Sequence, residues 1–485
     1  MDFPILTTIL LCPVAALFLI LLTPARMENV IRGIALVASA ATLVLSILLC
    51  LKFDVTNPSF QFVEHVEWVK SYGINYSNAV DGLNVTMILL TAIVIFTGVI
   101  VSFTVKFRAK DFFANMMFLV SGVFGVFMTT NLFFFFLFYE IAVIPMYLLI
   151  VIWGSTNKQY AAMKLTLYLL LGSALMFAGF LYMYSLPGGH TFDLMAIKQN
   201  VQFTPEIQNI LFITLFVGFG VLAACFPFHV WSPDGHVAAP TAASMLHAGV
   251  LMKLGAYGIL RIAVFLLPEG ARHWAYLIAV LSLCNIVYGA MVATQQKDLK
   301  FMIGYSSVSH MGIVLLGIAT LTPTGFNGAV FQMFAHGVMT ALFFACVGFI
   351  YDGCHTRIVD ELGGLSKQAP KISAFFIIAG LCGLGIPGLG TFVAELLVTI
   401  AAVKVYPVIG VLSIIALLIT AYYILSAIQS AFYGPVNVKH EEFNDIGWLQ
   451  FFPRAVLVSC LIFSGIFPQV FIGWISITTK TLMGS

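Results

Sequence analysis

The stretch LFFFFLFYEIAVIPMYLLIVIW, residues 132–153, decides the class of this fold. It contains a single ionisable side chain, Glu140. An α-helix needs about 20 mainly apolar residues to cross the hydrocarbon core of a bilayer. The run therefore predicts a transmembrane helix with a carboxyl group near its centre. Because a charge there costs roughly 2.5–3.5 kcal/mol, Glu140 needs a functional explanation.

The composition agrees with a membrane protein. The chain has 485 residues, of which 61% are hydrophobic and 9% are charged, and its net charge is +2. Soluble proteins carry about 25% charged residues, so this chain has too few charges to cover a surface that faces water. Lipid is therefore its expected solvent, and the small net charge predicts no nucleic-acid partner. The first apolar run has no basic flank before it, which favours a retained helix over a cleaved signal peptide.

The cysteines predict no chemistry of their own. All eight are scattered, and most lie inside apolar runs. The sequence holds no CxxC pair and no Cys/His cluster with the spacing of metal ligands. We therefore expect no disulfide framework, no metal site and no redox cofactor in this chain.

Apolar runs long enough to span a bilayer occur about fourteen times, which predicts an all-α polytopic membrane protein. The expected spans are residues 4–23, 30–51, 82–104, 112–130, 132–153, 161–185, 207–231, 241–265, 274–294, 302–320, 326–350, 373–404, 407–433 and 453–478. Proline and glycine interrupt the seventh span, around CFPFHVWSP, and the twelfth, around GLGIPGLGTF. Backbone groups freed by such breaks survive at membrane depth only inside protein or beside water.

The two breaks lie five spans apart and predict an internal repeat. Spans 4–8 and 9–13 would form two five-helix repeats, and the second would be inverted because five is an odd number. The expected parts are residues 1–110 with three helices and an outer loop, 111–265 and 274–433 as the repeats, and 434–485 with the last helix. The alternative is that Pro227 and Pro387 only kink packed helices.

Basic residues are distributed unequally between the two sides of the predicted bundle. Fourteen of the 22 lie in the loops of one side, six lie on the other side, and Lys253 and Arg261 lie within the eighth span. The positive-inside rule then places both termini outside. It also places the segment 54–81 along the outer interface. We expect Arg261 and Lys300, each near a span end, to extend to the headgroups, and Lys297 and Asp298 to anchor a helix start.

Five ionisable residues lie near the middle of five different spans: Glu140, Lys253, His310, His336 and Glu395. Such groups can gain or lose a proton near neutral pH once burial and partners act on them. The set predicts a proton relay whose opposite charges are paired at rest. For any one of these residues, the alternatives are a neutral, hydrogen-bonded structural role or a misplaced span boundary.

Three histidines and an aspartate crowd the seventh and eighth spans. The spacings of seven and eleven residues between His229, His236 and His247 match no metal motif. We expect His229, Asp234 and His236 to line a polar entrance on the inner side. His247 is expected to make a hydrogen-bonding helix contact. All four are candidate accessory members of the relay.

Four motifs resemble one known family. They are PFHVWSPDGHVAAPTAASMLHAGVLMKLGAYG, FYEIAVIPMYLLIVIWG, QQKDLKFMIGYSSVSHMG and LGIPGLGTFVAELL. They are similar to motifs of the antiporter-like, proton-translocating subunits of respiratory NADH:quinone oxidoreductase (complex I), and of the related multisubunit sodium/proton antiporters. The resemblance covers residues from about 80 to 430. It is nearest to the subunit M, or chain 4, type, because that type has glutamate at the position of Glu395. The end of the chain soon after the fourteenth span agrees with this type.

The resemblance implies a function. Protons would enter from the inside through the first repeat, follow the five-residue relay and leave outward through the second. Electron transfer would take place in partner subunits that hold flavin, iron–sulfur clusters and quinone. The implied partners are L-, N- and K-type membrane subunits and a peripheral redox arm, in a bacterial or archaeal inner membrane or its organellar equivalent. The electron donor, NADH or a related one, is not indicated.

One departure from the family pattern concerns the partner of Glu140. The family has a lysine five residues before the proline of the PFH motif, whereas this chain has Leu222 there. No lysine occurs between Lys198 and Lys253, so Glu140 lacks its expected partner. Two alternatives to a redox-driven pump therefore stay open. One is a subunit of a sodium/proton antiporter driven by ion gradients, and the other is a scaffold of the membrane arm that does not conduct.

Overall fold

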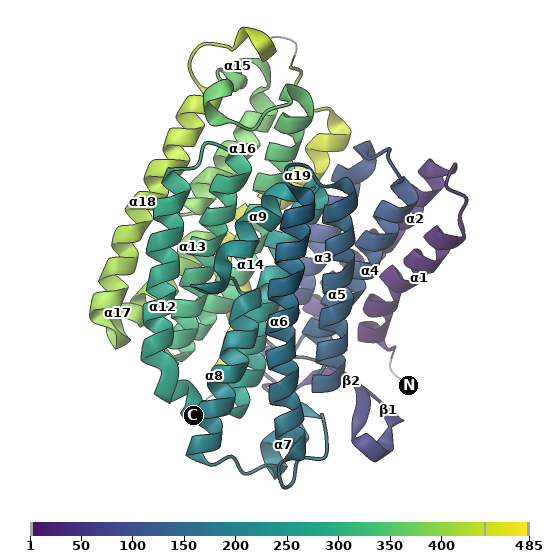
Figure 1. Cartoon of the computed structure of the whole chain (residues 1–485), viewed down its shortest axis with the longest axis vertical. Coiled ribbons are helices and arrows are strands. Elements are labelled where there is room, and N and C mark those ends of the chain that lie inside the picture. The colour runs from purple at the N-terminus through teal and green to yellow at the C-terminus, as the bar shows by residue number, and fades with distance from the viewer. Residues whose placement is uncertain (1–2, 441–442, 483–485) are drawn as a thin grey trace.

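The computed structural model describes residues 3–440 and 443–482 and shows a bundle of long, roughly parallel and antiparallel helices (Figure 1). Within that part, thirteen helices are long and apolar enough to cross a membrane. Each of them falls on one of the predicted spans. The prediction of an all-α membrane protein is confirmed, apart from one hairpin.

The helices of the first half, with their bounds, are α1 (Ile5–Leu22), α2 (Glu28–Lys52), α3 (Asn84–Val101), α4 (Ala109–Met128), α5 (Leu132–Trp153), α6 (Lys158–Ser185), α7 (Leu194–Asn200), α8 (Pro205–Leu222), α9 (Trp231–Ala238), α10 (Thr241–Leu246) and α11 (Met252–Gly258). The second half contains α12 (Pro268–Thr294), α13 (Leu299–Ala319), α14 (Pro323–Cys354), α15 (Leu365–Gln368), α16 (Pro370–Gly383), α17 (Gly390–Val405), α18 (Pro407–Phe432), α19 (Trp448–Ile466) and α20 (Pro468–Thr479).

Both predicted breaks are present. The seventh span stops with α8 at Leu222 and resumes as a 3₁₀ turn and the short α9. The twelfth span consists of α16, with 14 residues, and α17, with 16 residues. Between them, Gly385 and Gly388 have φ angles of 66° and 94°, which only glycine adopts without strain. Neither half of the twelfth span alone has the length of a bilayer-crossing helix, so the thirteen helices that are long enough to cross a membrane and this divided span account for the fourteen expected.

The eighth span is continuous but irregular. Its α-helical pieces α10 and α11 are joined and followed by π-helical segments, η4 (His247–Leu251) and η5 (Ile259–Val264). Every residue from 241 to 264 except Thr241 is buried. π-Helical turns inside α-helices are rare and often lie at functional sites.

Two features were not predicted. Residues 54–81 contain an antiparallel hairpin of β1 (Gln61–Val69) and β2 (Ile74–Val80), with Gly73 in the left-handed region between them. Glu64 fixes β1 to the start of α1 by accepting hydrogen bonds from the Leu6 and Thr7 backbones at 2.9 and 2.8 Å. The last expected span, 453–478, is two helices, α19 and α20, because Pro468 has no N–H to continue the ladder of α19.

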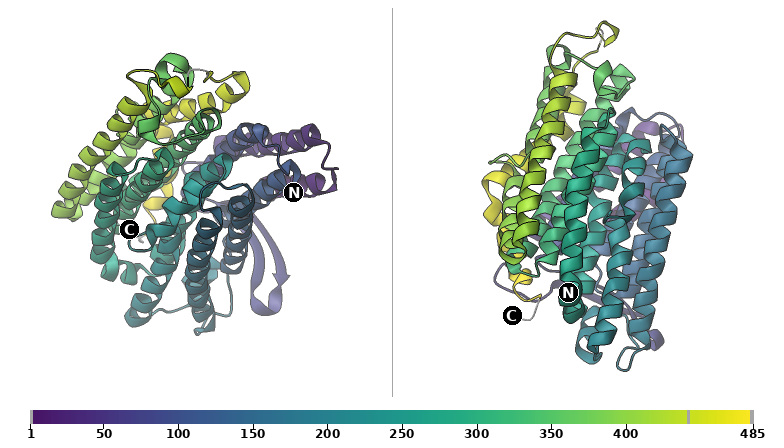
Figure 2. Two further views of the ribbon diagram at one scale, coloured as in Figure 1. Left: turned by 45° about the horizontal axis from the view of Figure 1, so that its top comes forward. Right: turned by 60° about the vertical axis from the view of Figure 1, so that its left-hand side comes forward.

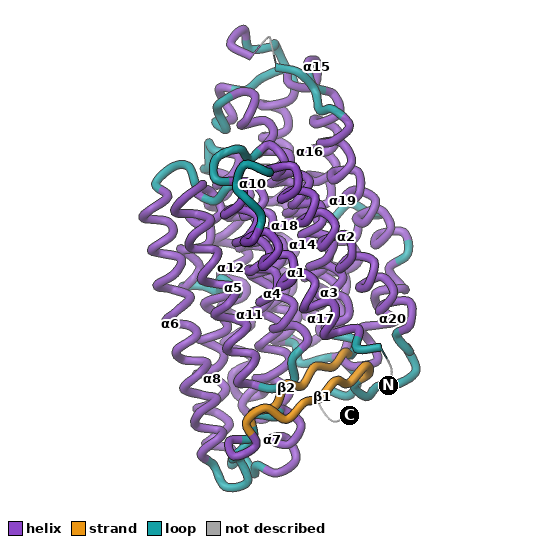
Figure 3. The backbone as a smooth tube through the Cα atoms, turned by 90° about the vertical axis from the view of Figure 1, so that its right-hand side faces the viewer, coloured by secondary structure: helices purple, strands orange, loops and turns teal. Residues whose placement is uncertain are grey.

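The hairpin and both ends of the described chain lie at one end of the bundle, opposite the end that carries α15 (Figures 2 and 3). The prediction that both termini share a side agrees with this arrangement. Which side faces outward stays a prediction, as does the division into two inverted repeats. In the interior, α14 contacts α10, α13, α16, α17 and α19, so both halves of the bundle meet along this helix.

Candidate functional site

Lys253 lies at the meeting point of the eighth span and α14. The two helices cross where Gly249 and Gly337 face each other, and a Cβ atom added to Gly337 would lie 2.5 Å from the Gly249 carbonyl oxygen. Small residues at a crossing let two membrane helices approach closely. The close approach places Lys253 Nζ 2.9 Å from Nδ1 of His336. The Lys253 ammonium also donates to the Ala248 carbonyl, five residues earlier and within the π-helical segment.

His336 continues toward a second cluster on α13 and α17. Its ring centroid lies 5.2 Å from that of His310, and Nδ1 of His310 lies 3.2 Å from Oε1 of Glu395. Gln332, one turn before His336 on α14, donates to Oε1 of Glu395 at 3.2 Å. These four side chains are buried, with exposed fractions of 4% or less. Lys253, His336, His310 and Glu395 therefore form one line of neighbouring ionisable groups through the interior.

Glycines also position Glu395. A Cβ atom at Gly328 of α14 would lie 3.0 Å from the Ala394 carbonyl oxygen, so α17 packs directly on the α14 backbone there. Gly385, in the break of the twelfth span, lies so near Glu395 that a Cβ atom would be 2.7 Å from its Oε2. The break therefore supplies the space that a buried carboxyl group needs.

The line has the chemistry of a proton path. Nε2 of His310 and Nε2 of His336 are buried and have no hydrogen-bond partner among the described residues. Each imidazole thus uses one nitrogen in the line and keeps the other free to accept or release a proton. An ammonium, two imidazoles and a carboxyl group in sequence can pass a proton by successive local transfers.

Glu140 does not join this line. It lies on α5, is half-buried, and has Ser173 of α6 beside its carboxyl group. Its buried Oε1 has no hydrogen-bond partner among the described residues. Leu222, at the position where the family has lysine, is the buried last residue of α8. The expected loss of a basic partner for Glu140 is thus visible, and the structure brings together four of the five predicted relay residues.

His236 and His247 form a second buried pair. Their ring centroids are 4.2 Å apart, and His236 contacts the Ser232 hydroxyl at 3.1 Å. Both nitrogens of His247 and Nδ1 of His236 have no partner among the described residues. The expectation that His247 makes a hydrogen-bonding helix contact is therefore wrong. His247 is positioned by packing instead. Its ring centroid lies 4.2 Å from that of His236 and 5.2 Å from that of Trp231.

The predicted entrance formed by His229, Asp234 and His236 is not a single site. Asp234 faces α6 and pairs with Lys164 at 2.7 Å. His229 is buried between aromatic rings, with the Tyr288 ring centroid 5.0 Å away. His236 points into the interior. Successive residues of a helix are rotated by about 100° about its axis, so neighbouring residues of a short helical segment point in different directions. The sequence alone does not show which of these directions faces the interior of the bundle.

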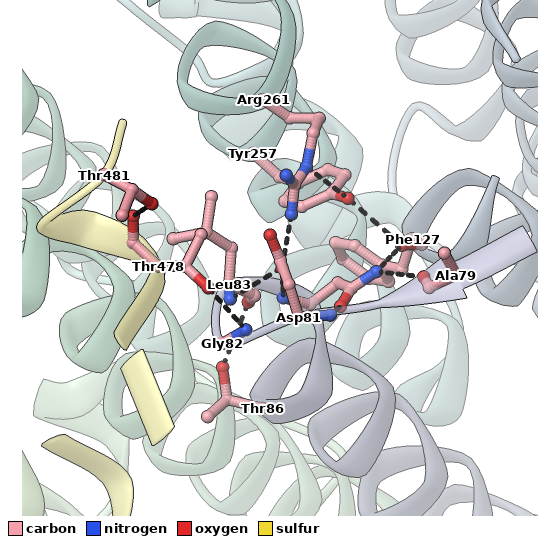
Figure 4. Close-up of polar contacts among 11 residues, drawn as sticks. Ala79, Asp81, Gly82, Leu83, Thr86, Phe127, Tyr257, Arg261, Thr478 and Thr481 are labelled. Carbon is pink, nitrogen blue, oxygen red and sulfur yellow. Dashed lines mark hydrogen bonds and ion pairs between the residues drawn. The ribbon is translucent and has the colours of Figure 1, made fainter. Parts of the chain in front are cut away.

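Arg261 does not extend to the headgroups. Figure 4 shows it folded back toward Asp81, with which it forms a buried ion pair, while its Nε donates to the Tyr257 hydroxyl at 3.1 Å. Both charged side chains of the pair are 4% exposed. Asp81 also accepts a hydrogen bond from the Leu83 backbone N–H at 3.0 Å and lies three residues before the first residue of α3. The pair fixes the C-terminal end of the eighth span to the start of the third.

A polar cavity opens at the opposite end of the bundle. It has a volume of about 540 Å³ and is lined by residues of α3, α4, α5, α10, α13, α14 and α19 and of the loops after α5 and α14, and its polar members include Ser155, Lys300, Asp352, Arg357 and Arg454. The expectation that Lys300 extends to the headgroups is wrong, because it is 4% exposed and donates to the Ala239 carbonyl at 2.8 Å. Asp298 does cap the start of α13 through the Lys300 backbone N–H, at 2.7 Å.

The cavity residues were missed because each lies near a span end, where a basic residue ordinarily marks the interface. Arg357 forms an ion pair with Asp298 at 3.1 Å, so a carboxylate compensates its buried charge. A group of three or more histidine, cysteine, aspartate or glutamate side chains that could hold a metal does not occur within residues 3–440 and 443–482. All eight cysteines are free.

Comparisons with known proteins agree with the geometry. Residues 129–420 match the family described as NADH:quinone oxidoreductase/Mrp antiporter, TM. NADH-quinone oxidoreductase subunit M of Rickettsia conorii is 34% identical over 491 aligned residues, covering 100% of this chain and 99% of that protein. A chain in respiratory complex I from Thermus thermophilus with bound NADH is 27% identical, with a TM-score of 0.90 and full coverage of both chains.

A third similarity reaches the antiporters. A chain of the Mrp complex from Dietzia sp. DQ12-45-1b is 20% identical, with a TM-score of 0.81, covering 99% of this chain and 96% of that one. At that identity the match shows a shared fold only. The resemblance predicted from the four motifs is confirmed. The chain belongs to the NADH:quinone oxidoreductase/Mrp antiporter family of membrane proteins.

Proposed function

We propose that this chain is a proton-translocating subunit of the membrane arm of an NADH:quinone oxidoreductase. The single observation that carries the proposal is the line from Lys253 through His336 and His310 to Glu395, in which contacts of 2.9 and 3.2 Å flank two imidazole rings whose centroids are 5.2 Å apart. The alignment with subunit M of Rickettsia conorii supports the same assignment, because it covers 100% of this chain and 99% of that protein.

The proposed mechanism couples the line to partner subunits. Charges buried in a medium of low effective dielectric interact strongly, so moving one proton changes the affinity of the next group for its own. Electron transfer in a peripheral redox arm, which would hold flavin, iron–sulfur clusters and the quinone, would supply the driving change. The L-, N- and K-type membrane subunits would flank this chain. Its role here is to hold and pass protons, and both termini would lie outside.

Glu140 keeps its place as a predicted relay residue, although it has no contact with the line. The separation of Glu140 from the line favours a second candidate function, a scaffold that does not conduct protons. A scaffold needs no continuous path between Glu140 and the other ionisable residues. A gradient-driven sodium/proton antiporter is the remaining alternative and uses the same fold. One experiment separates the three.

The test uses membrane vesicles with the inner face outward, in which the complete complex oxidises NADH. Proton uptake is followed with a pH-sensitive dye, and ferricyanide reduction by NADH reports the amount of assembled redox arm. Lys253→Met should sharply reduce the protons moved per NADH while ferricyanide reduction stays unchanged. The matched control is Lys297→Met, since Lys297 is an exposed lysine at the start of α13.

Unchanged proton uptake in Lys253→Met would contradict the proposal and favour the scaffold. Proton uptake that needs a sodium gradient and no electron donor would favour the antiporter. A loss of both proton uptake and ferricyanide reduction would mean that the variant fails to assemble, and His310→Gln would then test the same line at another helix.

A further inference from the structure

We propose that protons reach Lys253 from the inner face through the cavity at Lys300, and that Lys300 is the first residue of this chain to hold them. This inference rests on the proposed function of the Lys253 line. It names the inlet of that line, and it replaces Glu140 by a residue on a different helix.

The cavity supplies access from the surface to the interior. Asp352, which is exposed, lies at its wall, and Lys300, which is buried, lines the same space. The volume of about 540 Å³ is large enough for many water molecules, each of which occupies about 30 Å³ in the liquid. Water can therefore bring protons from the inner face to the ammonium group.

Lys300 differs from the two arginines of the cavity in its partners. Arg357 pairs with the carboxylate of Asp298, and Arg454 donates to Gln450 and to the Ala345 carbonyl. Lys300 has only neutral partners, namely the Ala239 carbonyl at 2.8 Å and the Ser244 hydroxyl at 3.4 Å. Asp298 and Asp352 lie within electrostatic range of Lys300, but neither forms an ion pair or hydrogen bond with it among the described residues. An amine, unlike a guanidinium, can release a proton.

The path inward continues along one face of α13. Gly304 lies one turn after Lys300, and a Cβ atom there would be 3.8 Å from Cδ2 of His236. The His236 ring therefore packs against α13 just above Lys300. It lies within electrostatic range of both Lys300 and Lys253.

The two histidines bridge the remaining distance. His236 lies 4.2 Å, centroid to centroid, from His247, and His247 is within electrostatic range of Lys253. Three of the four nitrogens of this pair have no partner among the described residues. Free imidazole nitrogens can take a proton on one side and give one up on the other. Lys300, His236, His247 and Lys253 thus form a route that does not include Glu140.

Two substitutions of Lys300 separate a proton-holding role from a structural one. In the vesicle assay, Lys300→Gln removes the exchangeable proton, whereas Lys300→Arg keeps the charge and the hydrogen bonds but cannot release a proton. If Lys300 passes protons, both variants lose proton uptake to the level of Lys253→Met while ferricyanide reduction is kept. Lys297→Gln is the matched control and should behave as the unmodified complex.

A second measurement does not depend on altering Lys300. Ser155 lines the cavity and is partly exposed, so Ser155→Cys places a thiol at the inlet. A bulky, membrane-impermeant thiol reagent added at the inner face should stop proton uptake in this variant. The unmodified complex, with its native cysteines, should keep it.

Restoration of proton uptake by Lys300→Arg would overturn the proposal, because only the charge would then matter, as in a site for a lipid phosphate or a structural anion. Uptake that persists in Lys300→Gln, or in the labelled Ser155→Cys variant, would overturn it as well. If Lys253→Met abolishes uptake while Lys300→Gln does not, only the inlet is wrong. If Lys253→Met has no effect, the proposed function itself fails.

Discussion

Removing one partner of the buried ion pair of Asp81 and Arg261 is expected to destabilise this chain strongly, because the other charge is then left buried without a partner. Asp81→Asn keeps the shape of the side chain and its ability to accept from the Leu83 backbone, which lies at 3.0 Å. It removes the only carboxylate that the described chain places against the buried guanidinium. Leaving one charge of a buried pair without its partner costs about 3–5 kcal/mol.

The size of this effect can be separated from side-chain loss by a double-mutant cycle. Arg261→Met leaves a buried carboxylate that still accepts backbone hydrogen bonds, so we expect a loss near the lower end of that range, about 3 kcal/mol. In Asp81→Asn with Arg261→Met, neither buried charge remains. The double variant should therefore be more stable than the sum of the two single losses predicts.

The assay is the free energy of unfolding of the purified chain in mixed micelles, titrated with a denaturing detergent. The matched control is the exposed pair of Lys70 and Glu67, whose side chains are 85% and 56% exposed at a distance of 3.4 Å. Glu67→Gln should change the free energy by less than about 1 kcal/mol. A loss of that small size in Asp81→Asn, or strictly additive losses in the double variant, would refute the reasoning.

Three further predictions concern the path and the orientation. Gly337→Ala should separate α14 from the eighth span, because its Cβ atom would lie 2.5 Å from the Gly249 carbonyl oxygen. Proton uptake by the vesicles should therefore fall. The control is Gly33→Ala, where no atom lies within 4 Å of the added Cβ, and this variant should keep its proton uptake. Glu140→Gln should retain most of the proton uptake that Lys300→Gln loses, since Glu140 makes no contact with the line; equal losses would return Glu140 to the inlet. Lys70→Cys should react with an impermeant thiol reagent only from the outer face and Lys297→Cys only from the inner face, and the reverse pattern would invert the predicted orientation.

Much of the fold could be predicted from sequence because lipid imposes a simple rule on helix length. Runs of about 20 apolar residues correspond to helices, and the prolines and glycines of two runs correspond to real breaks. The hairpin at 61–80 was not predicted, because residues 54–81 were expected only to lie along the outer interface. Neither strand alternates between buried and exposed positions, because β1 exposes residues 65–68 in a row and β2 buries residues 77–80 in a row, so the period-two signal of a strand was absent and only Gly73 marked the turn.

The relay residues were predictable as a set, whereas their contacts were not. Ionisable side chains in mid-span are expensive to bury, and five of them on five spans predict a relay, whereas any single one could have a structural role. Which of them touch depends on glycine contacts such as Gly249 with Gly337, which join residues far apart in the chain. For the same reason Glu140 was grouped with residues that it does not reach.

The predictions for charged residues at the ends of the spans were the least accurate. Arg261 and Lys300 both lie within a few residues of a predicted end, where extension to the headgroups is the ordinary outcome. A signal for Arg261 did exist, because Asp81 lies at the start of another span on the same side. Asp298 adjoins Lys300 in sequence, but it pairs with Arg357, and only the cavity shows that Lys300 is buried beside neutral groups.

The break in the twelfth span has a consequence for the life of this protein before assembly. With about 1.5 Å of rise per residue, α16 and α17 reach only about 21 and 24 Å, so their junction lies at membrane depth. Ile386, Pro387 and Gly388 are exposed there on the isolated chain. Irregular backbone cannot face hydrocarbon without loss of hydrogen bonds. In a newly inserted copy this junction would need water or a neighbouring subunit beside it, and assembly into the proposed complex would then protect the weakest point of the bundle.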